Sequence, residues 1–279
     1  MSQPLVVKFG GELLEEATRL AVVVRAIGAI VSRGVTVVVV HGGGKEIDVA
    51  LKAAHIEKRQ IEGLRITDDR TLDVVVSVLA GTINTRLVAA LTTAGIKAVG
   101  LTGADAACGL VEPAPRHQTV DGRLIDLERV GIPSGAADVS VVTLLAGHGY
   151  VPVLACIGLG ADGRLFNVNA DTCAGYLAAR LGARRLVIAG TTPGVLDGAG
   201  LTVPLLEPGA IDRLIASGTA TAGMIAKLRA GAHALGHGVG DVVIVDGRDG
   251  QALEEAAFDS RPARATRLVS AAASQCSPT

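Results

Sequence analysis

Aromatic residues are scarce in this chain. Its 279 residues include three Phe, two Tyr and no Trp, while 49% of all residues are hydrophobic. Proteins that hold single-stranded nucleic acid without sequence preference stack the bases on aromatic side chains, and so few rings cannot supply such a surface. A disordered chain is excluded as well, because disordered segments are poor in apolar residues. The sequence therefore predicts a folded protein with an aliphatic core.

Charge of either sign is also in short supply. Only 19% of the residues are charged, and 26 Lys and Arg balance 27 Asp and Glu, for a net charge of −1. Without a basic excess, no nucleic-acid partner is expected. The N-terminus shows no basic leader before an apolar run, and the most apolar region, 21–40, is interrupted by Arg25 and Arg33. We expect a cytoplasmic protein with no signal peptide and no membrane partner.

Cysteines are few and show no metal-binding or redox spacing. Cys108, Cys156, Cys173 and Cys276 form no CxxC pair. Two disulfides are an alternative, but reduced thiols in a cytosolic protein are the expected state. The histidines show no metal-ligand spacing either, so no metal site built by the protein alone is expected.

Short apolar runs alternate with helical stretches along most of the chain. This pattern predicts an α/β protein, a three-layer αβα sandwich whose mainly parallel central sheet is covered on both faces. Segments 110–133 and 157–166 carry Asp-Gly turns and predict β-hairpin additions that form a lid or rim. No further element is expected after residue 258, and the last ten residues are expected to fray. Strands are expected at 5–9, 35–41, 97–102, 150–157, 185–189 and 241–246, and helices at 15–32, 45–55, 68–95, 138–148, 171–181, 211–217, 224–235 and 251–258.

Glycine, by contrast, is plentiful: 36 of the residues are Gly. Three glycine turns, at 10–11, 42–44 and 190–194, follow predicted strands. Ligands of open parallel sheets bind beyond the carboxyl ends of the strands, and glycine turns that enter helices offer backbone N–H groups to anions. A packing role is the alternative. The spacing fits neither a P-loop nor a dinucleotide fingerprint.

Two lysines and one aspartate are candidates for chemistry. Lys8 stands in the otherwise apolar run LVVKF, where a charge is costly unless it meets an anion; an exposed edge strand is the alternative. Lys227 lies early on a predicted helix, where a solvated surface lysine is the simpler interpretation. Asp171 ends the segment NVNAD, and its simpler role is a helix N-cap.

Seven segments, in this order, carry a family resemblance. They are KFGG, VVVVHGGGKEID, GLRITDDRTL, LAGTINTRLV, NVNADTCAG, TPGVLD and GMIAKL. Over about residues 4–248 the chain resembles the amino acid kinase superfamily and, within it, the N-acetylglutamate kinases. The resemblance implies ATP-dependent phosphorylation of the side-chain carboxylate of N-acetyl-L-glutamate, in arginine biosynthesis. It also implies a substrate-binding and dimerising lobe at 1–182, an ATP-binding lobe at 183–279 and a homodimer.

The resemblance assigns roles to matching residues. Lys8 and Lys227 would bind the transferring phosphoryl group, and Asp171 would hold both ammonium groups. Backbone N–H groups of Gly11 and Gly44 would add hydrogen bonds. The substrate residues implied are Gly43 and Gly44 for the reacting carboxylate, Arg65 for the other carboxylate, and Asn167 for the acetamido or carboxylate group.

The resemblance also implies an ATP site with Mg²⁺ carried on the phosphates. Adenine is expected to be held by aliphatic side chains and backbone, with at most Tyr176 or Phe166 nearby. The chain departs from the family where Thr191 stands in place of an acidic residue and where Ala222 replaces Gly. Residues 258–269 also match poorly the Gly-rich end of arginine-regulated members, so insensitivity to arginine is expected. The ATP-binding residues implied are Gly10, Thr191, Gly194, Val195, Leu196, Thr221 and Gly223.

Two alternatives to this function stay open. A kinase for another acylated amino-acid carboxylate, such as the aminoadipate–carrier-protein kinases, needs a basic docking surface, for which Arg116, His117 and Arg123 are the candidates. A non-catalytic ligand-binding module on the same fold is the other, and the presence of Lys8, Asp171 and Lys227 argues against it.

Overall fold

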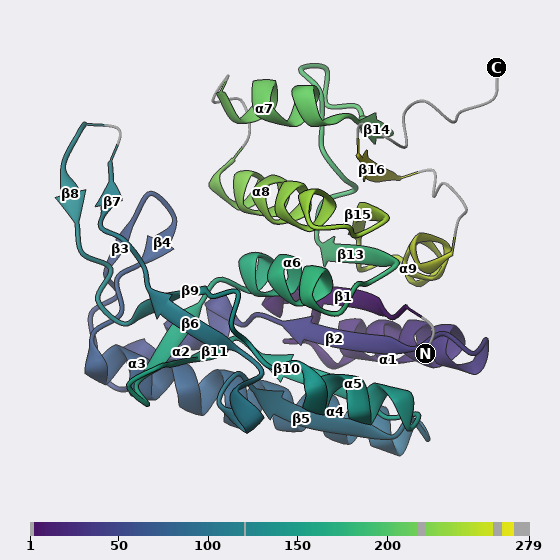
Figure 1. Cartoon of the computed structure of the whole chain (residues 1–279), viewed down its shortest axis with the longest axis horizontal. Helices are drawn as coiled ribbons and strands as arrows, with labels where there is room; N and C mark the ends of the chain where they lie inside the picture. Colours follow the sequence, from purple (N-terminus) through teal and green to yellow (C-terminus); the bar gives the residue numbers. More distant parts are fainter. Residues whose placement is uncertain (1–2, 120, 217–220, 259–263, 271–279) are drawn as a thin grey trace.

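The computed structural model describes residues 3–119, 121–216, 221–258 and 264–270. An eight-stranded sheet runs through the middle of the molecule (Figure 1). All its strand pairs are parallel except β15 with β16. In spatial order the strands are β14 (Leu205–Leu206), β16 (Ala265–Val269), β15 (Asp241–Asp246), β13 (Arg185–Gly190), β1 (Leu5–Phe9), β2 (Val37–His41), β10 (Val151–Ala155) and β5 (Ala98–Thr102).

Helices cover both faces of the sheet, and each face has its own apolar core. One core includes residues of α1 (Ala17–Ser32), α2 (Gly44–Ala53), α3 (Asp69–Val76), the π-helical η2 (Ser77–Ile83), α4 (Asn84–Thr93) and α9 (Gly250–Ala257). The other includes residues of α5 (Ser140–Gly147), α6 (Ala170–Arg180), α7 (Pro208–Ala216) and α8 (Ala222–Gly236). Figure 1 shows α6 and α8 side by side on this second face. The predicted α/β sandwich is confirmed.

Strand β1 divides its side chains between the two cores. Leu5, Val7 and Phe9 enter the first core, while Val6 enters the second. Because side chains alternate along a strand, Lys8 points to the same face as Val6, toward α6 and α8. The predicted central strands are continuous apolar runs because both of their faces are covered.

The helical run Asp69–Thr93 joins α3, η2 and α4 without a break. It begins after Asp68, whose side chain accepts a 2.7 Å hydrogen bond from the Thr71 amide. By length and composition alone this run is able to cross a membrane. One face of it packs against the sheet, with Val75, Leu79 and Ile83 in the first core, as in an amphipathic helix that covers a sheet.

The predicted hairpins are confirmed. Strands β11 (Ile157–Gly160) and β12 (Leu165–Val168) pair antiparallel, as do β7 (His117–Gln118) and β8 (Leu124–Ile125). Gly163 and Gly122 have φ of +81° and +84°, which an Asp-Gly turn tolerates because glycine lacks a Cβ. Strands β11 and β12 close a four-stranded barrel with β6 (Leu110–Pro113) and β9 (Val130–Pro133), and β3 (Gln60–Ile61) and β4 (Leu64–Arg65) form a further hairpin.

Two short 3-10 helices complete the described elements, η1 (Gly11–Leu13) and η3 (Asp105–Ala107). The prediction of no element after residue 258 is wrong, because β16 pairs with both β15 and β14. The strand was not predicted because Arg267 interrupts its apolar pattern. In the structure Arg267 pairs with Asp241 at 2.6 Å. Of the ten residues expected to fray, only Ser270 lies within the described residues.

Candidate active site

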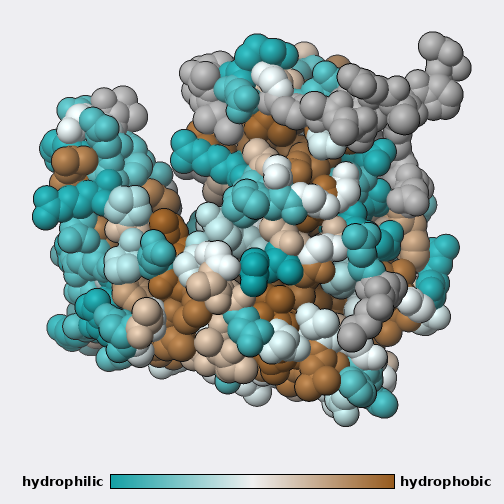
Figure 2. All heavy atoms as spheres, viewed as in Figure 1, coloured by the Kyte–Doolittle hydropathy of each residue, from teal (hydrophilic) through white to brown (hydrophobic). Residues whose placement is uncertain are grey.

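An open cleft of about 1270 Å³ lies at the carboxyl ends of β1 and β2. Figure 1 shows the β3–β4 and β7–β8 hairpins projecting beside α8, and Figure 2 shows the surface hollowed between this arm and the main body. Many of the predicted site residues line the cleft together. They are Lys8, Gly10, Gly11, Gly43, Gly44, Arg65, Asn167, Asp171 and Lys227.

Lys8 is a buried charge on a central strand. Strand β1 pairs with β2 on one side and β13 on the other, so the exposed-edge alternative is excluded, and Lys8 is only 5% exposed. Its Nζ lies 2.8 Å from Asp171 Oδ1. Burial lowers the pKa of Lys8, but the charge of Asp171 and a hydrogen bond to it outweigh burial and hold the pKa above its usual value. The lysine is therefore a fixed cation.

Asp171 lies in the first turn of α6, and it does not cap that helix. The cap is Asn169, whose side chain accepts hydrogen bonds of 3.0 and 3.1 Å from the amides of Asp171 and Thr172. The simpler interpretation of Asp171 as the helix cap is therefore excluded, because Asn169 fills the capping position. This frees the Asp171 carboxylate, and it turns toward the two lysines.

Lys227 reaches the same carboxylate from α8. Its Nζ lies 4.0 Å from Asp171 Oδ2 and donates a 3.3 Å hydrogen bond to the Gly223 carbonyl. Burial lowers the pKa of Lys227, against the opposing charge of Asp171. The solvated-surface interpretation is excluded, because the side chain is only 16% exposed. Packing of α8 on α6 thus brings together two ammonium groups that are far apart in sequence.

The glycine turns after β1 and β2 touch through their backbones. A Cβ on Gly11 would lie 2.6 Å from Gly43 Cα, and a Cβ on Gly43 would lie 2.1 Å from Ile83 Cδ1. Packing therefore explains these two glycines. Gly44 has no neighbour within 4 Å of an added Cβ among the described residues, so its open face suits the close approach of a ligand.

The N-terminus of α2 faces the cleft without a capping side chain. Gly43 is its N-cap and has no side chain to accept from the first-turn amides. Amides left free at a helix N-terminus bind anions, helped by the helix dipole. Behind this turn, Asn84 Nδ2 lies 3.1 Å from Nε2 of the buried His41. Asn84 was not among the residues predicted for the site; its place in the motif LAGTINTRLV was the one available signal.

Arg65 and Asn167 border the far side of the cleft. Arg65 Nη2 pairs with Asp48 Oδ1 at 2.5 Å, while its buried Nη1 has no partner among the described residues. Asn167 Nδ2 donates a 3.2 Å hydrogen bond to Thr67 Oγ1. One guanidinium nitrogen is therefore left to donate to a ligand. Asp48 was not predicted as a site residue, although it follows Gly44 by one helical turn.

The residues expected to bind ATP lie mostly outside this cleft. Of that set only Gly10 lines it. Gly194 has a φ of +122°, and a Cβ there would lie 2.5 Å from Thr266 Oγ1, which also accepts a 2.7 Å hydrogen bond from the Val195 amide. Thr221 caps α8. These contacts are structural, and the nucleotide-binding role of the set stays a prediction.

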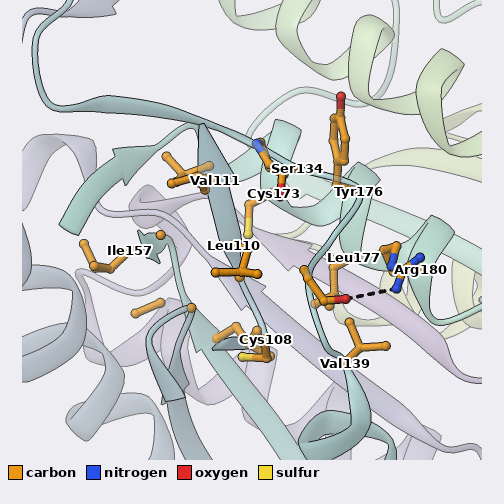
Figure 3. A pocket seen from close by; sticks show the side chains of 18 residues that line it. Cys108, Leu110, Val111, Ser134, Val139, Ile157, Cys173, Tyr176, Leu177 and Arg180 are labelled. Carbon is orange, nitrogen blue, oxygen red and sulfur yellow. Dashed lines mark hydrogen bonds between the residues drawn. The ribbon is translucent and has the colours of Figure 1, made fainter. Parts of the chain in front are cut away.

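A second, smaller pocket shares Val168 with the cleft and lies between the barrel and α6 (Figure 3). Its lining is mainly apolar and includes Cys108, Cys173 and Tyr176. Tyr176 stacks on His233, with ring centroids 3.7 Å apart, and Phe166 is buried; neither ring lines the cleft. Cys108, Cys156 and Cys173 are free thiols, and Cys276 lies outside the described residues.

This geometry agrees with a comparison against known families, in which residues 3–246 match the amino acid kinase family. The chain belongs to the amino acid kinase family. A relative from Novosphingobium aromaticivorans, named acetylglutamate kinase, is 39% identical over 273 residues, which cover 92% of this chain and 88% of the relative. Another from Acidiphilium cryptum with the same name is 40% identical, covering 88% and 83%. The family and the acetylglutamate kinase branch expected from the motifs are confirmed.

Solved structures of other proteins share the fold. An N-acetylglutamate synthase from Neisseria gonorrhoeae, solved with coenzyme A and N-acetyl-glutamate, superposes with a TM-score of 0.82 at 24% identity. The match covers 96% of this chain and 59% of the synthase, so the chain spans less than two thirds of that protein. A carbamate kinase from Giardia lamblia bound to citric acid gives 0.67 at 14% identity, covering 96% and 99%. Both likenesses show the amino acid kinase fold alone.

Proposed function

We propose that this protein transfers the terminal phosphoryl group of ATP to the side-chain carboxylate of N-acetyl-L-glutamate, giving ADP and N-acetylglutamyl 5-phosphate in arginine biosynthesis. The observation that carries the proposal is a single cleft in which Lys8 and Lys227 flank Asp171, beside two glycine turns. The relatives named acetylglutamate kinase support the choice of substrate.

The two lysines suit phosphoryl transfer. This reaction spreads negative charge over the oxygens of the transferring group, so catalysis depends on positioning and on fixed positive charge. Lys8 and Lys227 would hold those oxygens from two sides, while Asp171 keeps both ammonium groups in place. Gly11 and Gly44, which line the same cleft, would add backbone N–H donors. A non-catalytic module would have no need for two costly buried cations.

The substrate would lie between α2 and the β3–β4 hairpin. Gly43 and Gly44, at the uncapped start of α2, would receive the reacting carboxylate. The unpartnered Nη1 of Arg65 would form a charge-assisted hydrogen bond with the other carboxylate. Asn167, whose amide nitrogen is engaged by Thr67, would accept from the acetamido N–H group.

Membership of the kinase family implies ATP as phosphoryl donor. The lobe 183–279 would bind the nucleotide through Thr191, Gly194, Val195, Leu196, Thr221 and Gly223, with Gly10 at the phosphates. Mg²⁺ supplies charge neutralisation when bound with ATP, and the described residues contain no cluster of three or more His, Cys, Asp or Glu to hold it alone. The lobe 1–182 would bind the substrate.

We further propose that the protein acts as a cytoplasmic homodimer. Strand β5 lies at one edge of the described sheet and is partly exposed. Leu144 on α5 and Tyr150 before β10 are exposed apolar side chains, at 58% and 39%, and α5 packs against β10, the neighbour of β5. Sedimentation velocity is expected to show a dimer of the 28.2 kDa chain, and a monomer at micromolar concentration would contradict this.

An ADP-release assay tests the substrate directly. N-acetylglutamate, glutamate, aspartate and 2-aminoadipate are compared side by side, and ADP release is expected with N-acetylglutamate alone. Activity only with a non-acetylated substrate would overturn the assignment. The carrier-protein alternative has less support, because His117 pairs with Glu62 and Arg123 with Asp121, which neutralises much of its docking surface.

The Arg65→Ala variant tests the substrate pose. Loss of a charge-assisted hydrogen bond costs about 1.5–3 kcal/mol, so KM for N-acetylglutamate is expected to rise about 10- to 100-fold with a smaller change in kcat. Arg59→Ala is the matched control, because Arg59 pairs with Glu128 at the surface and does not line the cleft. Equal KM values for the two variants would contradict the pose.

A further inference from the structure

One carboxylate stands unpaired among the cations of the cleft. Glu12 follows the glycine turn of β1 and lines the cleft together with Lys8 and Lys227. It is partly buried. No residue that the structure describes forms a hydrogen bond or a close ion pair with its side chain, whereas Asp171 pairs with both lysines.

The position of this carboxylate is set by two glycine turns. A Cβ on Gly10 would lie 2.6 Å from both carboxylate oxygens of Glu12, and a Cβ on Gly190 would lie 3.8 Å from Oε1. The same point on Gly190 is 3.5 Å from Lys227 Cε. Glu12 therefore lies between the turns that follow β1 and β13, on the side of Lys227. Its charge acts on both Lys8 and Lys227 and favours their protonated forms, although burial still holds the pKa of Lys227 below its usual value.

A carboxylate at this place would repel the phosphates of ATP that carries no metal ion. The free amides of α2 and the two ammonium groups form an anion site, and the terminal phosphates of ATP carry several negative charges. Like charges a few ångströms apart repel one another even at the effective dielectric of a protein surface. A divalent cation between the carboxylate and the phosphates would turn this repulsion into attraction.

The donor chemistry fits Mg²⁺. This ion takes hard oxygen ligands and is usually held by one or two carboxylates together with substrate phosphates and several waters. Glu12 supplies one such carboxylate. Asp171, the other carboxylate beside the lysines, is held by Lys8 and Lys227.

We propose that Glu12 is the protein's own ligand for the Mg²⁺ of bound MgATP, in contact with the ion directly or through one of its waters. The inference rests on the proposed function and adds a protein group to an ion expected to be carried by the phosphates alone. It makes the preference for metal-bound nucleotide a property of this chain: Glu12 repels metal-free ATP and attracts MgATP.

Nucleotide affinity tests the proposal without turnover. Isothermal titration calorimetry measures the Kd of the non-hydrolysable analogue AMP-PNP in excess MgCl₂ and in EDTA, for wild type, Glu12→Gln and Glu16→Gln. Glu16 is the control, because its side chain is 57% exposed and pairs with Arg19 at the surface. In wild type, Mg²⁺ is expected to tighten binding. In Glu12→Gln this gain is expected to fall about tenfold or more, the usual effect of losing a metal-supporting group.

Three outcomes decide the matter. A gain that falls in Glu12→Gln and is kept in Glu16→Gln supports the proposal. The proposal is overturned if Mg²⁺ tightens AMP-PNP binding by the same factor in all three proteins. It is also overturned if Glu12→Gln raises the Kd in MgCl₂ and the Kd in EDTA by the same factor, because Glu12 then only positions Lys227. Thermal unfolding of the unliganded variants shows that each is folded. Within the described residues, the substitution removes no hydrogen bond or close ion pair of the Glu12 side chain.

The same measurements separate this proposal from the proposed function. Wild type that releases no ADP with N-acetylglutamate but binds AMP-PNP in a Mg²⁺-dependent manner refutes the substrate and leaves Glu12 testable. Wild type that is active while Glu12→Gln keeps its full Mg²⁺ gain refutes the metal ligand alone. Wild type that binds no nucleotide in either condition refutes both.

Discussion

The ammonium group of Lys8 is bound more closely to Asp171 than that of Lys227. Lys8 lies 2.8 Å from Asp171 inside the sheet, while Lys227 lies 4.0 Å from it at the rim of the cleft. Lys227→Met is therefore expected to lower kcat by about 10²- to 10³-fold with little loss of stability. Lys8→Met should lower activity and also destabilise the fold by about 3–5 kcal/mol, because it leaves a buried carboxylate without its close partner.

Steady-state kinetics and urea unfolding of both variants check these expectations. Lys52→Met serves as control, because Lys52 is exposed on α2 and lies outside the cleft. Wild-type kcat in Lys227→Met would contradict the role of the second ammonium group. Unchanged stability in Lys8→Met would contradict the buried pair.

His41 predicts a pH dependence of stability. Burial, with a small contribution from the charge of Arg86 and against a hydrogen bond with Gly42, lowers the pKa of His41 to about 4. Between that value and about 6.5 the unfolded chain binds a proton that the folded chain does not, so stability present at neutral pH is lost as pH falls. Linkage predicts a loss of about 2 kcal/mol between pH 7 and pH 5 from this group. Urea unfolding of wild type and His41→Asn measures it: the variant should lose less stability over that interval, and equal losses would rule His41 out.

Two glycines of the cleft are required for different reasons, Gly11 for packing and Gly44 for the approach of a ligand. Gly11 touches the backbone of Gly43, whereas Gly44 has open space beside it. Gly11→Ala is expected to destabilise the protein by about 1–3 kcal/mol, the usual cost of overpacking. Gly44→Ala should leave the unfolding free energy close to wild type and raise KM for N-acetylglutamate tenfold or more, because a displacement of about 1 Å is costly at a binding site. Urea unfolding and kinetics of the pair decide this, and a wild-type KM in Gly44→Ala would exclude ligand contact there.

The start of α6 couples a helix cap to the active site. Asn169 accepts from two amides of the first turn, and Asp171 is held in that turn. Asn169→Ala should cost about 1 kcal/mol and lower kcat, because the carboxylate loses its support. Asn169→Ser keeps a capping oxygen and is expected to recover the stability. Thermal unfolding and kcat of the two variants test the coupling, and equal stability of Ala and Ser would contradict it.

The end of the sheet far from the cleft is joined by a buried ion network. Asp241 on β15 pairs with Arg185 on β13 and Arg267 on β16, each at 2.6 Å. Asp241→Asn is expected to destabilise the protein by about 3–5 kcal/mol, because it leaves the buried Arg185 without its carboxylate. KM values should stay at wild type, since Arg185 aligns with Leu5 at the opposite end of β1 from the glycine turn.

Urea unfolding measures this effect, with Asp162→Asn as control. Asp162 pairs with Arg164 on an exposed hairpin turn, so its unfolding free energy should stay unchanged. If Asp162→Asn lowers the free energy of unfolding as much as Asp241→Asn does, the buried network contributes no more to stability than an exposed ion pair.

Much of the fold was predictable from the chain because its signals are local. Val37–His41 and Asp241–Asp246 are short apolar runs bounded by turn residues, a pattern typical of central parallel strands. Strand β16 was missed because Arg267 interrupts its apolar pattern; in the structure this arginine is partly exposed and pairs with Asp241. Asn169 was missed as the cap because Asp171, two residues further on, is an equally suitable capping residue by its type.

The amino-acid order alone was enough to predict the strand–helix alternation, the glycine turns and the cation in an apolar strand, since each depends on residues a few positions apart. The meeting of Lys8, Asp171 and Lys227 depends instead on the strand order that places β13 beside β1 and on α6 packing against α8. The same packing places the Asp171 carboxylate against both lysines. It leaves the Glu12 carboxylate without a close ion pair among the described residues. Distances between remote segments follow from burial of the two apolar cores, which no local pattern encodes.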